Sequence, residues 1–160
     1  MRKLRTTLLA LAGLAVAVGL TVAGPAWGET VCIPINAKGE GRITSQTLTE
    51  TDTESRIKGG GILHGTTTAQ LFPTGFDPAT GIETFEGSLV LTTKHGTLTL
   101  CVFNGVFDTT TGEFSNDSTV VDGTGRFAGA TGGLFFHGFV AADGTFTDDE
   151  ITGEICVEVP

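Results

Sequence analysis

The chain has 160 residues, of which nine are Lys or Arg and 18 are Asp or Glu, so its formal net charge is −9 at pH 7. This length accommodates one domain and a leader. The acidic balance argues against nucleic-acid binding, because such binding depends on Lys and Arg side chains that neutralise phosphates.

The start of the chain predicts a secretory signal peptide over residues 1–28. A positively charged MRKLR segment is followed by an apolar run, and small residues at 26 and 28 fit a cleavage site. We therefore expect cleavage after Gly28, export to the periplasm or the medium, and a domain over 29–160. Cleavage would leave six basic and 18 acidic residues, a net charge of −12, and no stable membrane insertion. An uncleaved anchor is the alternative, because the apolar run is only slightly shorter than a bilayer span.

The rest of the chain has the composition of an all-β domain. Thr, Val, Ile and Phe are frequent, Gly occurs 24 times, and turn signals recur at short intervals. The three glycines at 59–61 predict a bend or bulge inside one long strand. The expected strands, with hairpin turns at several of the junctions, are 31–36, 41–51, 54–63, 65–72, 83–93, 97–107, 113–122, 133–142 and 145–158.

Alternation predicts the inward face of two strands. In the last strand, Ile151, Ile155 and Val157 alternate with Glu154 and Glu158, as expected of a half-buried strand. In the strand over 97–107, the expected inward set is Leu98, Leu100, Val102, Asn104 and Val106. The strand over 133–142 is apolar on both faces, so alternation leaves the side of His137 open.

Eight or nine short antiparallel strands in meander order predict a closed barrel rather than a sandwich, because closure removes exposed sheet edges. A barrel of about eight strands is either filled by side chains or holds one small ligand. The chain lacks Tyr, and its one Trp lies in the predicted leader, which argues against a sugar-binding site. Its 11 Phe residues favour a dry core or an apolar pocket.

Three cysteines in an exported chain permit one disulfide and leave one thiol. If the sheet closes on itself, the first and last strands become neighbours, which favours a bond between Cys32 and Cys156. A bond to Cys101 is the alternative.

The glycine-rich segment 123–133, GTGRFAGATGG, suggests a phosphate-binding loop at first sight. Its glycines at 123, 125 and 129 give G-x-G-x-x-x-G instead of the dinucleotide-binding G-x-G-x-x-G, and no helix is expected after it. We predict instead that the glycines let the backbone turn and approach a neighbouring strand. Arg126 would cap carbonyl groups or cover one end of the barrel.

Five motifs stand out in the second half of the chain: KHGTLTL at 94–100, FDTTTGEF at 107–114, VDGTGRFAGATGG at 121–133, DGTF at 143–146 and ITGEI at 151–155. Together they resemble those of bacterial proteins in the allene oxide cyclase-like and dirigent-like barrel superfamily. The resemblance implies a calycin-type, eight-stranded antiparallel barrel with an apolar interior, and in some members cyclisation of a reactive apolar substrate without a cofactor. The carboxylate and cysteine site of the plant cyclase has no counterpart here, nor do the acidic pocket residues of dirigent proteins.

Two functions follow as hypotheses. The first is binding of a small hydrophobic molecule. Asn104 and His137 would hydrogen-bond to it, and Phe103 and Phe136 would be further ligand contacts. The second is a cofactor-free cyclase or isomerase in which Glu86, together with His137, assists proton transfer. Glu86 fits that role only if its face of the strand points inward; on the outer face it is an ordinary surface charge. A filled barrel with a surface interaction role is a third hypothesis.

No cofactor or metal is predicted. The three histidines, His64, His95 and His137, lie on separate expected strands without a ligand pair, and the carboxylates at 143–150 lack the order of a calcium loop. Residues 116–118 match a glycosylation acceptor. The expected partner is a small hydrophobic molecule, and a homo-oligomer is compatible with the interpretation.

Overall fold

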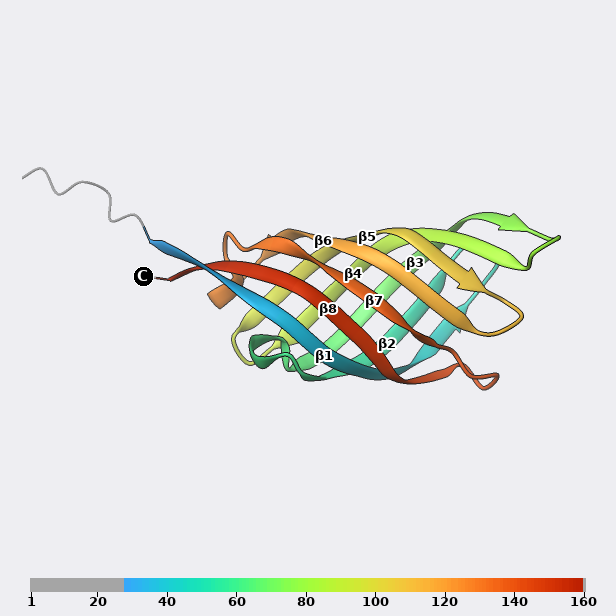
Figure 1. Ribbon diagram of the computed structural model, residues 1–160, viewed down its shortest axis with the longest axis horizontal. Coiled ribbons are helices and arrows are strands. Elements are labelled where there is room, and N and C mark those ends of the chain that lie inside the picture. The colour runs from blue at the N-terminus through green and yellow to red at the C-terminus, as the bar shows by residue number, and fades with distance from the viewer. Residues whose placement is uncertain (1–27, 160) are drawn as a thin grey trace, which may run out of the picture.

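The computed structural model describes residues 28–159, except for the side chain of Asp148. Eight antiparallel strands follow one another in chain order, and the last pairs with the first to close a barrel (Figure 1). The predicted all-β fold, a closed eight-stranded antiparallel barrel, is thus confirmed. The predicted leader lies outside the described residues apart from Gly28. The strands are β1 (Glu29–Gln46), β2 (Thr51–Gly59), β3 (Gly65–Asp77), β4 (Ile82–Thr93), β5 (Gly96–Asp108), β6 (Glu113–Gly123), β7 (Thr131–Phe139) and β8 (Thr145–Val159).

Several of the expected strand boundaries are wrong; β3, for example, continues to Asp77 instead of ending at 72. The segments expected as separate strands over 31–36 and 41–51 form the single strand β1 up to Gln46. Gly41 marks a close approach rather than a break, because a Cβ there would lie 2.5 Å from the Cβ of Ser55 on β2. The three glycines at 59–61 do not bend a continuous strand. Their positive φ angles end β2 and begin the one-turn 3-10 helix η1 (Gly61–Leu63).

The meander places the two ends of the described chain at the same end of the barrel. This end, which we call the terminal end, carries the connections 59–65, 93–96 and 123–131. The opposite end, which we call the distal end, carries the connections 46–51, 77–82, 108–113 and 139–145. In Figure 1 the terminal end lies on the left, where β1 and β8 cross.

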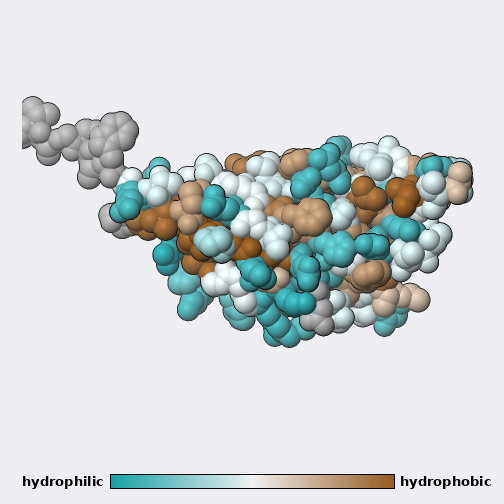
Figure 2. Space-filling view, viewed as in Figure 1, coloured by the Kyte–Doolittle hydropathy of each residue, from teal (hydrophilic) through white to brown (hydrophobic). Residues whose placement is uncertain are grey.

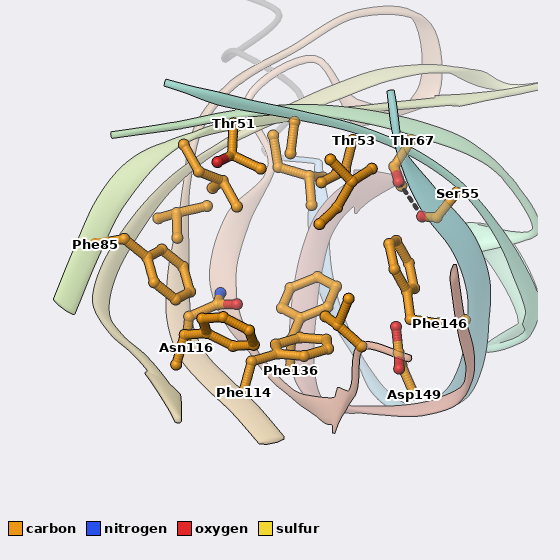
Figure 3. Close-up of a pocket in the computed structure, with 18 of the residues that line it drawn as sticks. Thr51, Thr53, Ser55, Thr67, Phe85, Phe114, Asn116, Phe136, Phe146 and Asp149 are labelled. Atoms are coloured by element: carbon orange, nitrogen blue, oxygen red, sulfur yellow. Dashed lines mark hydrogen bonds between the residues drawn. The ribbon is translucent and has the colours of Figure 1, made fainter. Parts of the chain in front are cut away.

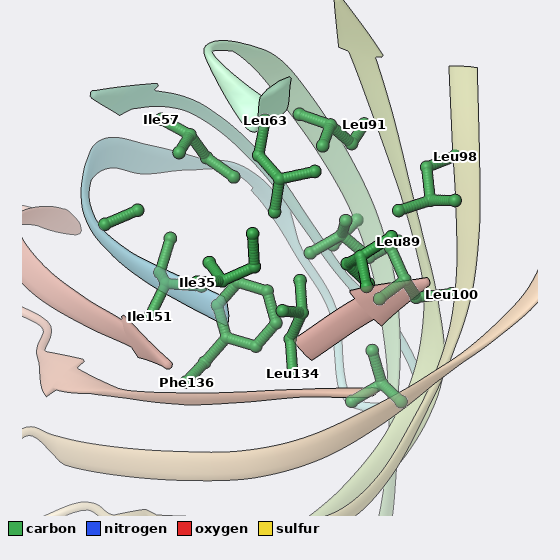
Figure 4. Packing of buried hydrophobic residues seen from close by; sticks show 14 of the residues in the cluster. Ile35, Ile57, Leu63, Leu89, Leu91, Leu98, Leu100, Leu134, Phe136 and Ile151 are labelled. Carbon is green, nitrogen blue, oxygen red and sulfur yellow. The ribbon is translucent and has the colours of Figure 1, made fainter. Parts of the chain in front are cut away.

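The terminal half of the barrel is filled with side chains. Leu63 from η1 and Phe127 from the second 3-10 helix, η2 (Gly125–Phe127), are both fully buried and occupy this end. Burying one such side chain contributes about 1.5–3 kcal/mol. Figure 4 shows aliphatic side chains of the surrounding strands converging on Leu63. The inward side chains with at most 3 % exposure include Ile35, Ile57, Leu91, Leu98, Leu100, Ile155 and Val157.

The glycine-rich segment at 123–131 crosses the terminal end and closes it. The backbone N–H of Arg126 donates a hydrogen bond to the carbonyl of His95 at 2.9 Å. A Cβ on Gly125 would collide with that same carbonyl. The predicted close approach is therefore confirmed. The backbone of Arg126 makes this contact, and its side chain is exposed.

The predicted disulfide is confirmed. Cys32 on β1 and Cys156 on β8 face each other in the register of the two strands and are bonded. Cys101 is a free thiol on the outer face of β5.

The outer surface carries scattered apolar side chains among polar ones. On the face shown in Figure 2, hydrophobic side chains gather where β1 and β8 leave the barrel and again near the distal end. None of the helices in residues 28–159 has the length and hydrophobicity needed to cross a bilayer. Five of the 11 Phe side chains are exposed to about half, namely Phe72, Phe76, Phe103, Phe135 and Phe139.

Candidate functional site

The distal half of the barrel encloses a cavity of about 130 Å³. All eight strands contribute lining residues, and the cavity reaches the distal end, because Gln46 and Thr51 at the β1–β2 turn line it. An engineered apolar cavity of about 150 Å³ binds benzene, so this volume suits a molecule with a single aromatic ring or an apolar body of similar size. Most of the wall is apolar (Figure 3). Its aromatic side chains are Phe85, Phe107, Phe114, Phe136 and Phe146.

Glycines on neighbouring strands make room for these rings. Phe85 pairs with Gly105 across β4 and β5, and a Cβ on Gly105 would lie 2.5 Å from Phe85 Cε2. Phe146 pairs with Gly41 across β8 and β1, and a Cβ on Gly41 would lie 2.7 Å from Phe146 Cε2. Each ring therefore lies against the barrel wall over a glycine. This arrangement leaves the centre of the distal half open.

The third pair of this kind also accommodates a carboxyl group. Phe114 on β6 pairs with Gly138 on β7. A Cβ on Gly138 would lie 2.7 Å from the carboxyl carbon of Asp149 and 3.1 Å from Phe114 Cε1. Asp149, on β8, is only 4 % exposed and lines the cavity. The absence of a side chain at Gly138 thus lets a carboxyl group and an aromatic ring share one niche in the wall.

Neutral polar groups line other parts of the cavity. Ser55 and Thr67 are joined by a hydrogen bond between their hydroxyl groups, on β2 and β3. Asn116 on β6 is 8 % exposed, and its Nδ2 donates to Ser118 Oγ at 3.1 Å. These groups could hydrogen-bond to a polar substituent on a ligand. Because Asn116 points inward, a glycan on it is incompatible with the folded barrel, so the acceptor motif at 116–118 is not a usable surface site.

A bulge in β5 overturns part of its expected inward face. Leu98, Leu100 and Val102 are buried as expected, but the pairing of β5 with β6 shifts register between Phe103 and Val106. Asn104 sits in the bulge at a φ of 51°, a conformation that Asn tolerates better than most residues. The bulge turns Asn104 outward, where its Nδ2 donates to Asp117 Oδ2 at 3.2 Å. Val106 is likewise exposed, and Phe107 lines the cavity in its place.

The two candidate proton-transfer residues lie outside the cavity. Glu86 is exposed on the outer face of β4, because the inward positions of that strand are taken by Phe85 and its alternate neighbours. The inward alternative for Glu86 is therefore wrong. His137 is partly exposed on the outer face of β7, where its Nε2 lies 2.8 Å from Glu113 Oε1. Neither residue is among those that line the cavity.

Of the four predicted ligand contacts, the structure brings only Phe136 to the cavity. Phe103 is 38 % exposed on the outer face of β5, while Asn104 and His137 also lie outside. The disulfide residues are at the terminal half of the barrel, on strands that close it. The structure therefore separates the predicted site residues rather than assembling them.

Sequence reasoning missed two carboxyl groups that do line the cavity, Asp149 and Glu83. In the sequence, Asp149 belongs to the carboxylates at 143–150, whose order does not match a calcium loop. The pairing of β8 with β1 shifts register, with Asp149 opposite Gly39 and Thr147 opposite Glu40. This irregularity turns both Phe146 and Asp149 inward, although strict alternation would put them on opposite faces. Glu83 had a usable signal, because it shares its parity with the apolar residue Phe85.

The residues that could hold a metal do not coincide with the cavity. Within residues 28–159, the group of three potential ligands that lie close together is Cys32, Glu154 and Cys156. Two of its three members are the bonded cysteines, whose sulfur atoms are not available as thiolates.

No protein-family model matches this chain, and no curated protein matches it in sequence. Membership of the allene oxide cyclase-like superfamily thus remains a prediction from the motifs.

Proposed function

We propose that this protein binds a small hydrophobic molecule in the distal cavity of its barrel. The observation that carries the proposal is the contrast between the two halves of the interior. The terminal half is filled by Leu63, Phe127 and the aliphatic side chains around them. The distal half holds a cavity ringed by five phenylalanines. A barrel with a purely structural role would gain stability from filling both halves.

The chemistry of the wall favours an apolar occupant. Removing apolar surface from water contributes about 25 cal/mol for each Å², and the Phe rings supply most of the surface against which a ligand would pack. The neutral polar groups, such as Asn116 and the pair Ser55 and Thr67, would orient a single polar substituent. An apolar body the size of one aromatic ring fits the volume.

We further propose that binding takes place outside the cell. The disulfide between Cys32 and Cys156 is of a kind that persists in oxidising compartments. The predicted leader is consistent with that location.

Toluene, a neutral apolar probe with a single aromatic ring, tests the binding function. We expect it to raise the melting temperature of the wild-type protein in proportion to the logarithm of its concentration, because a ligand that binds only the folded state stabilises it. The variant Ala69→Leu adds side-chain volume to the cavity wall and should abolish the shift. Thr68→Leu, on the adjacent outward position of β3, is the matched control and should retain it.

A wild-type protein that shows no shift up to the solubility limit of toluene would contradict the proposal. Equal shifts in Ala69→Leu and Thr68→Leu would place binding elsewhere than in the cavity.

A cofactor-free cyclase or isomerase is the second candidate function. The observation that favours it is the inward carboxyl group of Asp149, since a proton donor or acceptor inside an apolar cavity is what such a reaction requires. The test incubates the protein with an apolar extract of the source culture and uses chromatography coupled to mass spectrometry, in which a conversion appears as a new peak of unchanged mass. A conversion that survives in Asp149→Asn would exclude this residue, and Glu86→Gln is the control that should retain activity.

A further inference from the structure

Every charged side chain that lines the cavity is acidic. Glu83 and Asp149 face the interior, and no Lys, Arg or His in residues 28–159 lines it. A ligand with a carboxylate would place a negative charge in apolar surroundings that offer no cation to pair with it, beside two acidic side chains. The cavity therefore selects against fatty acids and similar anions, although its apolar wall suits their hydrocarbon parts.

Asp149 is placed to meet a positive group. Its carboxyl group lies between two glycines of adjacent strands, Gly39 on β1 and Gly138 on β7. A Cβ on Gly39 would be at ordinary contact distance from the carboxyl group, 3.6 Å from Oδ2, whereas a Cβ on Gly138 would overlap it. The backbone of the two flanking strands thus leaves room for this carboxyl group inside an otherwise apolar wall.

Aromatic rings surround the same point. Phe114 shares the niche over Gly138 with Asp149, and the rings of Phe114 and Phe146 meet edge to face at 6.2 Å. Figure 3 shows Asp149 beside Phe146, with Phe136 and Phe114 across the base of the cavity. A cation near aromatic faces is stabilised by their quadrupoles, and the interaction strengthens when water is excluded. Rings together with a carboxylate would compensate an ammonium group for the loss of its hydration.

We propose that the cavity takes a primary amine on a compact apolar body, with the ammonium group hydrogen-bonded to Asp149 and flanked by Phe114 and Phe146. This inference deepens the proposed binding function and rests on it. It names the ligand class as a protonated primary amine whose apolar body is about the size of one aromatic ring.

Three small molecules that share a phenyl ring and differ in the attached group test the inference. Calorimetric titration of the wild-type protein with phenethylamine, phenethyl alcohol and phenylacetate compares a cation, a neutral group and an anion of similar size. We expect the amine to bind about tenfold tighter than the alcohol, the margin of one charge-assisted hydrogen bond. Phenylacetate should bind more weakly than either.

Two variants locate the selectivity. Asp149→Asn keeps the size of the side chain and removes its charge, so the amine should lose its advantage while the alcohol still binds. Glu150→Gln is the matched control, because Glu150 is the next residue and is exposed on the outer face. It should keep the wild-type ranking.

The outcomes separate the two proposals. If the alcohol binds and the amine binds no tighter, the amine proposal fails while the proposed binding function stands. If neither binds, both fail. Retention of the full amine preference in Asp149→Asn would overturn the assigned role of this residue. Should that variant not fold, the wild-type ranking of the three compounds alone still decides the ligand class.

Discussion

The ring of Phe85 lies over Gly105, its cross-strand partner in β5, at a spot that any larger residue would occupy with its own Cβ. The same relation joins Phe146 to Gly41 on the opposite side of the barrel. Aromatic rings laid on glycines cover exposed backbone and keep to the wall. This packing accounts for a cavity in the distal half of a barrel whose other half is filled.

Replacing Gly105 by Ala should both destabilise the protein and alter the cavity. The new Cβ would lie 2.5 Å from the Phe85 ring and from the Phe85 carbonyl, so the ring must move. Overpacking of this kind costs about 1–3 kcal/mol. The measurement is the free energy of unfolding in urea.

Gly39→Ala is the matched control, because it is also an inward glycine but its Cβ would meet neighbours no closer than 3.5 Å. Equal losses in the two variants would show that the cost comes from glycine replacement in a strand and not from the position of the ring.

Truncation of Phe127 should be among the most damaging substitutions in the barrel. This side chain is fully buried and closes the terminal end together with Leu63. Phe127→Ala removes its burial and leaves a void, which costs about 3–5 kcal/mol. Thermal unfolding followed by circular dichroism measures the loss.

Phe139→Ala provides the comparison, because Phe139 is 54 % exposed on the outer face of β7. We expect it to change stability by about 0.5 kcal/mol or less. A small effect of Phe127→Ala would mean that the stability of the terminal end does not depend on the Phe127 side chain.

Loss of the disulfide should weaken the closure between β1 and β8. The bond joins residues 124 apart in sequence, and removing such a crosslink typically costs about 2–5 kcal/mol. The double variant Cys32→Ser with Cys156→Ser should therefore melt well below the wild type. The wild type should fall to a similar temperature when it is unfolded in dithiothreitol.

The exposed thiol at Cys101 offers the control. Cys101→Ser should leave the melting temperature unchanged, and it should remain as sensitive to dithiothreitol as the wild type. A double variant with wild-type stability would contradict the role given to the bond.

Acid should weaken the turns at the distal end. Asp108 accepts hydrogen bonds from the hydroxyl and the backbone N–H of Thr110 at 2.6 and 2.8 Å, and these lower its pKa below the ordinary value. The hydroxyl of Thr145 lowers the pKa of Asp143 in the same way. Because the pKa is lower in the folded state, this stabilisation is fully present above the unfolded-state pKa, roughly 4, and is lost as the pH falls through the folded-state value.

Urea unfolding of the wild type and of Asp108→Asn between pH 7 and pH 2 tests the direction of this pH dependence of stability. The wild type should lose more stability than the variant over the acid part of this range. Asp122→Asn, which removes an exposed carboxyl group of β6 outside these turns, should follow the wild type. An identical acid response in wild type and Asp108→Asn would contradict the assignment.

The sequence determined the fold class and the closure. Gly and Asp at the turns, alternation in the last strand and the positions of Cys32 and Cys156 all depend on local pattern or on chain order, and the barrel and the disulfide follow from them. The inward set of β8 from Ile151 onward was correct for the same reason.

The contents of the cavity were decided by the tertiary structure. Strict alternation assigns each residue a face only while the pairing stays regular, and the bulges in β5 and between β1 and β8 break that rule. One extra residue was enough to send Asn104 outward and to bring Asp149 inside. Whether a bulge forms depends on the pairing of neighbouring strands, which the local sequence of one strand does not contain.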